Sequence, residues 1–360
     1  MAEPRWIKLI CTVGPASLKP HILERMEQLG VDLLRINLSH TALEEVEEMV
    51  RTIRSACAIP LCLDTEGAQI RTGRIAGGKV ELVRGRTVRL TADEILGDAS
   101  TFTLTPAVAL EHLEPGMLLR VDFHEVVLQI LERARDGSVI AQVRRSGQVG
   151  SNKGVATHWE VPLPGFSSKD RWAIAKAAEE GIANFALSFA SSEVTVRELR
   201  TMVGAAATLI AKVESRAGIA NLDGIIRAAD AVLIDRGDFS REIPFEQLPI
   251  FQKRIIAKAH QKPLPVYVAT NLLDSMVSYH RPFRAEINDM VNALLDGANG
   301  LVLAAETAIG KYPVECVRMV RHIIRQHERQ FWADRTFRVA RRSARRPERP
   351  AARRTVARAQ

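Results

Sequence analysis

Charged residues stand directly after short apolar runs at several distant points of the sequence. One run, residues 231–234, ends on an Asp-Arg-Gly-Asp segment whose second aspartate is Asp238, and another ends on Lys212 and Glu214. Lys212 and Glu214 are two residues apart, so on a strand their side chains point the same way. Carboxylates suit a hard divalent cation such as Mg²⁺ or Mn²⁺, and a nearby lysine suits phosphoryl oxygens. The pattern predicts phosphoryl transfer at a metal site formed by Glu214 and Asp238.

Similar polar residues follow the apolar runs nearer the N-terminus. Arg35 offers a guanidinium that can bind phosphate oxygens with two of its nitrogens. Oxygen atoms for a second cation are available from Asn37, Ser39, Asp64 and Thr65. Each of these residues alone would fit a structural ion pair at a strand end equally well. Because so many of them follow comparable runs, we expect them to share one site.

A parallel (β/α)₈ barrel, a fold of the α/β class, would bring such residues together. Eight short apolar runs alternate with amphipathic helical segments such as 20–29 and 43–54, in which apolar residues recur on one face. Continuous apolar runs are typical of strands covered on both sides, and in this barrel the carboxyl ends of all strands meet on one face. The predicted strands are 7–14, 32–39, 60–67, 184–191, 208–215, 231–238, 265–271 and 300–307.

One interval interrupts the alternation of strands and helices. From about residue 74 to 157 the helical period disappears, and strands rich in Val, Leu and Thr take its place. The segment RDGS at 135–138 predicts a hairpin between two of these strands. We therefore expect a small all-β lid domain at 74–157, inserted after strand 3 of a TIM barrel formed by 1–73 and 158–330.

The net charge of +8 belongs to the end of the chain. Residues 331–360 contain ten arginines and two acids, so residues 1–330 are neutral. The composition of this Arg-rich tail cannot build a core and predicts a disordered or partly helical segment. A nucleic acid or an acidic partner could dock on the tail, although a solvated extension without a partner explains the composition equally well.

The cysteines and the hydropathy pattern favour a cytoplasmic protein. Cys11, Cys57, Cys62 and Cys316 form no C-x-x-C pair, which is typical of reduced thiols in the cytoplasm. No apolar run reaches the length of about 18 residues that a membrane span requires. The apolar stretch near the N-terminus is too short for a secretory signal.

At the level of its motifs, the sequence resembles the pyruvate kinase family over about residues 5–328. The matching motifs include KLICTVGPAS, LLRINLSHT and CLDTEGAQIRTG in the first strands, and GSNKGV at the end of the predicted insertion. Others are LIAKVESRAGIANLDGII, RGDFSREIPFEQLPIFQKRII and the long stretch VATNLLDSMVSYHRPFRAEINDMVNALLDGANGLVLAAETAIGKYPVE. The resemblance implies an enzyme that transfers phosphate from phosphoenolpyruvate to ADP and releases pyruvate and ATP.

The resemblance also implies a role for each predicted site residue. It implies catalytic roles for Lys212, Arg35 and Thr270, and binding of the substrate carboxylate by Thr270 and the backbone amides of Gly237 and Asp238. The metal ligands it implies are Glu214 and Asp238 for Mg²⁺ or Mn²⁺, and Asn37, Ser39, Asp64 and Thr65 for K⁺. The nucleotide contacts it implies come from Pro15, His40, Arg71 and Lys153.

The sequence departs from the family pattern at several positions near this site. Glu66 stands where the family usually has lysine, which sets an acid beside the predicted K⁺ and phosphate sites. Ala304 stands for a serine whose hydroxyl the family is thought to use in protonating the enolate. Asp235 replaces a usual alanine, and this second acid either raises the pKa of a neighbouring carboxylate or faces outward.

Where the family continues with a C-terminal effector-binding domain, this sequence has the Arg-rich tail. We therefore expect a short form without the usual effector control, assembled as a homodimer through barrel helices or monomeric. Two alternatives stay open. One is a diverged phosphotransferase or enolate-forming enzyme with another acceptor, and the other is a catalytically weak barrel that serves as a binding or regulatory protein through its tail.

Overall fold

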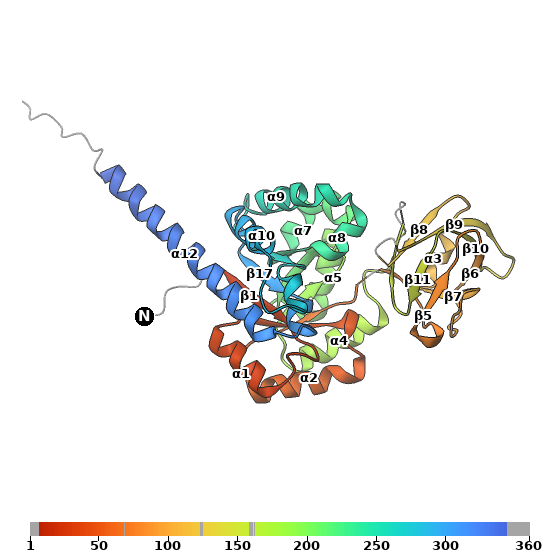
Figure 1. Ribbon diagram of the computed structural model, residues 1–360, viewed down its shortest axis with the longest axis horizontal. Coiled ribbons are helices and arrows are strands. Elements are labelled where there is room, and N and C mark those ends of the chain that lie inside the picture. Colours follow the sequence, from red (N-terminus) through yellow and green to blue (C-terminus); the bar gives the residue numbers. More distant parts are fainter. Residues whose placement is uncertain (1–6, 68, 123–124, 158–160, 162, 344–360) are drawn as a thin grey trace, which may run out of the picture.

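The computed structural model describes residues 7–67, 69–122, 125–157, 161 and 163–343, with residues 331–343 described by their backbone. Within these residues, eight parallel strands close into a barrel in the order β1-β17-β16-β15-β14-β13-β3-β2, which confirms the predicted fold class (Figure 1). Each strand falls inside the run predicted for it. The strands are β1 (Lys8–Thr12), β2 (Leu33–Asn37), β3 (Leu61–Asp64), β13 (Asn184–Leu187), β14 (Thr208–Val213), β15 (Ala231–Asp235), β16 (Val266–Ala269) and β17 (Gly300–Leu303).

Side chains of the barrel strands alternate between the helix layer and the barrel interior. In β14, Leu209 and Ala211 pack in the apolar layer shared with the helices, whereas Ile210 packs in the interior cluster. Lys212 is the next inward position after Ile210, and it is buried. Along four further strands, a polar residue likewise lies two positions after an apolar residue of the interior. These pairs are Leu33 and Arg35, Cys62 and Asp64, Ala186 and Ser188, and Leu233 and Asp235. The barrel therefore has an apolar interior and a polar layer at the carboxyl ends of its strands.

Amphipathic helices follow the strands and cover the outside of the barrel (Figure 1). In α1, which the apolar period predicted, Met26 is buried, and Ile22 and Leu29 are half-buried against the same core. Helix α2 likewise buries Val46, Val50 and Ile53 on one face. The helices are α1 (Pro20–Leu29), α2 (Leu43–Ala56), α4 (Ser168–Glu179), α5 (Glu193–Val203), α6 (Arg216–Ala220), α7 (Leu222–Ala228), α8 (Arg236–Glu242), α9 (Leu248–Ala259), α10 (Arg284–Leu295), α11 (Ala305–Ala308) and α12 (Pro313–Ser343), with 3₁₀ turns η1 (Leu38–His40), η3 (Phe245–Gln247) and η4 (Asp274–Val277).

The described residues between 70 and 157 form a second, smaller closed barrel beside the first (Figure 1). Its strand order is β10-β6-β7-β4-β12-β8-β9, and β11 pairs separately with β5. Strands β9 and β10 are an antiparallel pair joined at 134–138, which confirms the predicted hairpin. Strand β4 begins at Ile70, ahead of the expected boundary at residue 74. The elements are β4 (Ile70–Thr72), η2 (Ala76–Gly78), β5 (Lys79–Leu82), β6 (Thr87–Thr91), β7 (Thr101–Thr105), α3 (Val108–Glu111), β8 (Leu118–Val121), β9 (Val126–Arg133), β10 (Val139–Arg145), β11 (Gly147–Gly150) and β12 (Gly154–Thr157).

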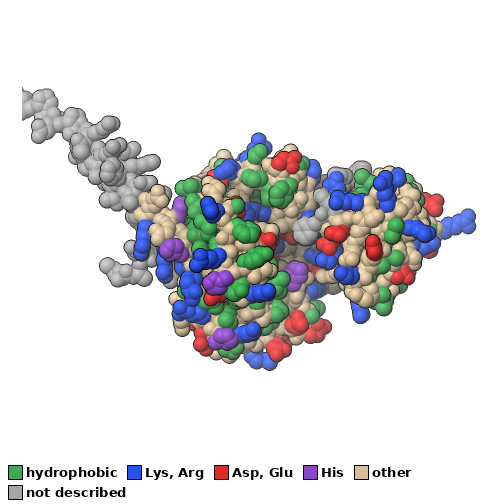
Figure 2. All heavy atoms as spheres, viewed as in Figure 1, with side chains coloured by type: hydrophobic (Ala, Val, Ile, Leu, Met, Phe, Trp, Pro, Cys, Tyr) green, Lys and Arg blue, Asp and Glu red, His purple; other side chains and the backbone are tan. Residues whose placement is uncertain are grey.

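Helix α12 continues through Ser343 and projects away from the barrel (Figure 1). Residues 331–343 of the predicted tail are therefore helical, and the rest of the tail lies outside the described residues. Among the helices of the described part of the chain, none is long and apolar enough to cross a membrane. Basic, acidic and apolar side chains are mixed over the visible face of both barrels, as expected for a body without net charge (Figure 2).

Candidate active site

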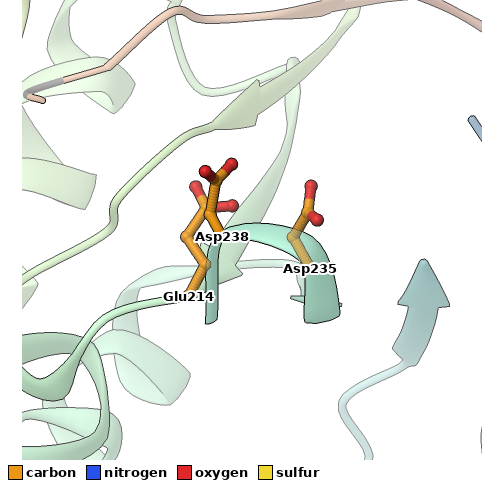
Figure 3. Close-up of side chains that lie close together, drawn as sticks. All are labelled: Glu214, Asp235 and Asp238. Carbon is orange, nitrogen blue, oxygen red and sulfur yellow. The ribbon is translucent and has the colours of Figure 1, made fainter. Parts of the chain in front are cut away.

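Three carboxylates meet at the carboxyl ends of β14 and β15. Glu214 directly follows β14, Asp235 is the last residue of β15, and Asp238 lies in the first turn of α8. One oxygen from each residue lies within 4.8 Å of the others, and Figure 3 shows the three side chains pointing to the same side. The predicted pair of Glu214 and Asp238 thus lies together, and Asp235, whose direction the sequence left open, faces the same site.

Lys212 and Arg35 are the buried cations of this site. The Nζ atom of Lys212 lies 3.2 Å from an oxygen of Asp235, 3.3 Å from one of Glu214 and 3.5 Å from one of Asp64. The Nη1 atom of Arg35 lies 3.0 Å from Oδ2 of Asp64. Lys212 and Arg35 thus face Asp64, Glu214 and Asp235, and the fourth carboxylate of the site, Asp238, pairs with Arg241 over 3.0 Å. The site therefore has an excess of negative charge, and a bound divalent cation would more than compensate it.

Burial and neighbouring charge act in opposite directions on Lys212 and Asp235. Burial lowers the pKa of Lys212, but the carboxylates, with Asp64 and Glu214 the strongest, outweigh it and raise that pKa above its ordinary value of 10.5. Burial raises the pKa of Asp235, but Lys212 and Arg35 outweigh it and lower that pKa to about 2. Both residues are therefore charged at neutral pH.

At Glu214, burial has a larger effect on the pKa than the neighbouring cation does. Burial raises the pKa of Glu214 well above its ordinary value, and Asp235 and Asp238 raise it further against the lowering effect of Lys212. Its Oε1 accepts a hydrogen bond from the amide of Phe189 over 2.6 Å, whereas its Oε2 is buried without a hydrogen bond. A divalent cation would stabilise a carboxylate in such surroundings.

Asp235 accepts hydrogen bonds from two groups that the resemblance assigns to the carboxylate of the substrate. Thr270 Oγ1 donates to Asp235 Oδ1 over 2.6 Å, and the amide of Gly237 donates to the same oxygen over 3.3 Å. Thr270 has a φ of 75°, which is rare for a β-branched residue, and the guanidinium of Arg236 donates to its carbonyl over 2.7 Å. A Cβ at Gly237 would lie 2.9 Å from Thr270 Cγ2, so glycine is needed there. The carboxylate of Asp235 therefore already accepts hydrogen bonds from both the Thr270 hydroxyl and the Gly237 amide.

The four residues predicted to bind K⁺ lie at the ends of β2 and β3. Asn37 is paired with Asp64 in the strand register, and its side chain accepts a hydrogen bond from the amide of Ser39 over 3.0 Å. Asp64 and Thr65 are fully buried. Ser188 Oγ donates to Asp64 over 3.2 Å, and the Ser188 amide donates to Thr65 Oγ1 over 2.9 Å. The four residues thus follow one another along the ends of two adjacent strands.

Both barrels contribute the residues predicted to contact the nucleotide: Pro15, His40, Arg71 and Lys153. Arg71, in β4, donates to Ser39 Oγ over 3.4 Å and so connects the small barrel to the end of β2. Lys153 forms an ion pair of 3.1 Å with Asp122 of the small barrel. Burial lowers the pKa of His40, and the charge of Arg71 lowers it further, so His40 is neutral at neutral pH. Pro15 is exposed in the loop after β1.

Glu66, where the family has lysine, lies between two cations. Its Oε1 is 3.6 Å from Nε of Arg71, and its Oε2 is 3.9 Å from Nζ of Lys169. The carboxylate of Asp170 accepts hydrogen bonds from the amides of Glu66 and Gly67 over 2.7 and 3.1 Å, which fixes the loop. The charge of Glu66 is therefore balanced by its neighbours, rather than directed at the phosphate site.

Thr12 and Ser188 also belong to the site, although the sequence analysis did not single them out. Ser188 Oγ accepts a hydrogen bond from Lys212 Nζ over 2.9 Å, and Thr12 Oγ1 accepts one from Arg35 Nε over 2.9 Å. Each lies two residues after an interior apolar residue of its strand, so the strand period was the signal that could have found them.

Comparisons with known proteins agree with this geometry. Residues 4–317 match the family described as "Pyruvate kinase, barrel domain". The chain is 34% identical over 330 residues to the pyruvate kinase of Sporosarcina psychrophila, an alignment that covers 89% of this chain and 56% of that relative. It is 37% identical over 329 residues to the pyruvate kinase of Agrobacterium vitis, covering 89% of this chain and 68% of the relative. The pyruvate kinase of Mycobacterium tuberculosis H37Rv is 35% identical over 326 residues, with 88% and 69% covered.

The chain spans little more than half the length of the Sporosarcina relative and of the Bacillus licheniformis pyruvate kinase, of which it covers 57%. The match nevertheless includes all eight strands of the large barrel, the small barrel between them and every residue of the charged cluster. This chain therefore belongs to the pyruvate kinase family.

Proposed function

We propose that this chain transfers the phosphoryl group of phosphoenolpyruvate to ADP, giving pyruvate and ATP. The bond from phosphorus to the enol oxygen breaks, a bond to the terminal phosphate oxygen of ADP forms, and the enolate takes up a proton at carbon. The observation that carries this proposal is the buried cluster in which Lys212 and Arg35 face three carboxylates at the barrel mouth. The chain's similarity to the pyruvate kinases of Sporosarcina psychrophila and Agrobacterium vitis supports the same reaction.

In this proposal Lys212 and Arg35 bind the phosphoryl oxygens and stabilise the charge that spreads over them during transfer. Both side chains are only 4% exposed, so their charges act in surroundings of low dielectric constant, where they are strongest. Thr270 and the amides of Gly237 and Asp238 bind the substrate carboxylate. The small barrel acts as a lid that excludes water while the phosphoryl group is in transit.

Glu214 and Asp238 fit the Mg²⁺ or Mn²⁺ ion that the family implies. Their oxygens lie within 4.8 Å of each other, and Glu214 Oε2 is buried without a hydrogen bond. When bound, the cation would neutralise charge on the phosphoryl and enolate oxygens. We assign K⁺ to the oxygens of Asn37, Ser39, Asp64 and Thr65, and the nucleotide to Pro15, His40, Arg71 and Lys153.

The test of the proposed function is a coupled assay with phosphoenolpyruvate, ADP, Mg²⁺ and K⁺. We expect equal amounts of pyruvate and ATP, and no product when phosphoenolpyruvate, ADP or Mg²⁺ is omitted. Proton exchange on pyruvate without ATP formation would contradict the proposal and indicate an enolate-forming enzyme with another acceptor. Omitting K⁺ alone tests the second cation site separately.

Asp235 should weaken the binding of phosphoenolpyruvate. Its carboxylate already accepts the hydrogen bonds of Thr270 and Gly237, which this proposal assigns to the substrate. It also adds negative charge where an anionic substrate must bind. The substrate must therefore displace Asp235 from these donors before its own carboxylate can use them.

We predict that Asp235→Ala lowers the KM for phosphoenolpyruvate by about tenfold, since removing one opposing charge is worth about 1.4 kcal/mol. Steady-state kinetics with varied phosphoenolpyruvate measure this effect. Asp235→Asn, which keeps the size of the side chain and an acceptor for Thr270, should give an intermediate KM. An unchanged or raised KM in Asp235→Ala would show that Asp235 does not compete with the substrate.

We also propose that the chain forms a homodimer through the large barrel, with its contact surface on the loops that adjoin helices α10 and α11. Tyr279, Phe283 and Ile309 are large apolar residues that are each more than 60% exposed. The rings of Tyr279 and Phe283 are in contact, and a hydrogen bond from the Lys311 amide to the Val277 carbonyl joins the two loops that carry these residues. Such a patch is typical of a contact surface. We expect light scattering to give a dimer for the wild type and a monomer for Phe283→Asp.

A cytoplasmic location is the remaining part of the proposal. Cys11, Cys57, Cys62 and Cys316 are all free thiols. Burial raises the pKa of each of them, which keeps the thiols protonated and unreactive. Free, unreactive cysteines are typical of proteins from a reducing compartment.

A further inference from the structure

A cleft of about 700 Å³ lies between the two barrels, next to the charged cluster but lined by other residues. The small barrel contributes Arg120 from β8 and Arg145 from the end of β10. The large barrel contributes Arg216, the first residue of α6, and Arg241 of α8. The volume is in the range of pockets that bind small molecules, about 300–1,000 Å³.

The lining of this cleft is strongly basic. Four arginines line it, and Glu242 is the acid among the residues that surround it. Burial raises the pKa of Glu242 above its ordinary value, so its charged form is less favourable there than in water. Guanidinium groups bind phosphate oxygens in pairs of hydrogen bonds, and a cleft lined by charge of one sign concentrates ligands of the opposite sign.

Arg241 is fixed where the two barrels meet. Its Nη1 forms an ion pair of 3.0 Å with Asp238, and its side chain is 15% exposed. A Cβ at Gly154 of the small barrel would collide with the Arg241 guanidinium, so the glycine leaves the room that this side chain occupies. Arg216 is held as well, because its Nε donates to the carbonyl of Glu242 over 2.6 Å. Two of the arginines thus have a defined place before any ligand binds, which lowers the entropic cost of binding.

The rim of the cleft carries an aromatic side chain. Phe245, the first residue of η3, lines the cleft with 75% of its surface exposed, beside Ile243 and Pro244. An exposed aromatic ring next to arginines suits a ligand that has an apolar or aromatic part as well as negative charge. Inorganic phosphate would leave this part of the cleft without a contact.

We propose that this cleft binds a small organic phosphate, with its phosphate held by Arg120, Arg145, Arg216 and Arg241 and its apolar part against Phe245. Because both barrels contribute arginines, the ligand would also hold the small barrel against the large one. The site is separate from the predicted nucleotide contacts and needs neither the metal nor the transfer reaction. The proposal therefore stands or falls independently of the proposed function.

The experiment is isothermal titration calorimetry with AMP and with pyrophosphate, in EDTA and without phosphoenolpyruvate. We compare the wild type with Arg145→Ala/Arg216→Ala, which removes one arginine from each barrel. The double variant should bind both probes at least tenfold more weakly, since it removes charge-assisted hydrogen bonds from both sides of the cleft. A matched control, Arg144→Ala/Arg197→Ala, removes one exposed arginine from each barrel outside the cleft and should change the affinity less than twofold.

Three further variants locate the binding. Lys212→Met alters the charged cluster and Lys153→Met alters the predicted nucleotide contacts, and each should leave AMP affinity within twofold. Phe245→Ala should weaken AMP about fivefold and leave pyrophosphate unchanged. The proposal is overturned if the double variant binds as the wild type does, if Lys212→Met or Lys153→Met abolishes binding, or if the wild type binds neither probe at millimolar concentration. Equal affinity of Phe245→Ala and wild type for AMP would overturn the assignment of an organic ligand. Circular dichroism confirms that each variant is folded.

Discussion

Replacing Lys212 with methionine should lower kcat by about a thousandfold while the enzyme still binds phosphoenolpyruvate. Removing one preorganised donor that stabilises transition-state charge typically costs 10²–10³ in rate, about 2.7–4 kcal/mol. Lys212 is at the upper end of this range because it is a full charge, buried, and within 3.5 Å of three carboxylates that fix its position. Methionine has nearly the same length, so the change removes the charge and leaves most of the packing. The measurement is kcat in the coupled assay.

The same substitution should also destabilise the fold, and this must be separated from the loss of activity. Without Lys212, Glu214 and Asp235 lose their nearest cation and Asp64 keeps only Arg35, and breaking buried pairs in this way costs about 3–5 kcal/mol at pH 7. The pKa of Lys212 is raised in the folded state, so in the wild type its stabilisation is fully present below pH 10.5 and is lost only as pH rises through the higher folded value. In the variant the unpaired acids take up protons more readily. The difference in free energy of unfolding between wild type and variant, measured by urea unfolding, should therefore shrink as pH falls below about 5.

Two control variants complete this test. Lys258→Met removes a lysine on α9 that pairs with Asp223 near the surface, and it should keep wild-type kcat. Lys212→Arg keeps the charge, so it should be more stable than Lys212→Met and yet remain slow, because a planar guanidinium cannot reproduce the ammonium contacts. Near-normal turnover in folded Lys212→Met would refute the role assigned to Lys212.

The architecture could be predicted because two sequence periods agree over most of the chain. Apolar runs of strand length and helical segments with one apolar face alternate eight times, and parallel strands of this kind close into a barrel. The small barrel was visible as a loss of the helical period. Strand β4 (Ile70–Thr72) begins before the expected boundary because it lies within the motif CLDTEGAQIRTG, which also contains the end of β3, and the glycine between the two strands did not mark a change of domain. Such a short strand gives too little pattern to show where the large barrel ends and the small barrel begins.

The members of the charged cluster could be predicted, but their pairings could not. The strand period indicates that Asp235 faces inward, two residues after the interior residue Leu233, and it could have settled the direction that the sequence analysis left open. That Thr270 would donate to Asp235 depends on the left-handed backbone at Thr270, for which a β-branched residue gives no sequence signal. One of the two ion pairs of Glu66 depends on Lys169, which is more than a hundred residues away in the sequence.

The arginine-lined cleft could not be predicted from any local pattern in the sequence. Arg120 and Arg145 lie on strands of the small barrel, whereas Arg216 and Arg241 belong to helices of the large one. In the sequence each looks like an ordinary surface residue, since arginine is common in such positions. The docking of one barrel against the other creates the cleft, and that arrangement is set by long-range packing rather than by any local pattern.

Glu214→Gln should weaken the binding of Mn²⁺ or Mg²⁺ by about 10–100-fold without disturbing the backbone around it. Glutamine has the shape of glutamate, and its Oε1 can still accept the hydrogen bond from the Phe189 amide. What is lost is the charge on the carboxylate whose Oε2 is buried without a hydrogen bond beside Asp235 and Asp238. Changing even an indirect partner of a metal ligand costs 10–100-fold, so a direct ligand should cost no less.

Calorimetric titration of Mn²⁺ into the protein without substrate measures this affinity directly, so the result does not depend on turnover. Glu242→Gln is the control, because it makes the same chemical change at a half-buried glutamate of α8 that lies outside the group of converging oxygens, and it should bind Mn²⁺ within twofold of the wild type. In the metal-free protein Glu214→Gln should be more stable than the wild type at pH 7, since burial and two neighbouring acids disfavour the charged form of Glu214. A variant that bound Mn²⁺ normally would show that the cation lies elsewhere, and the assignment of Glu214 and Asp238 as its ligands would then be wrong.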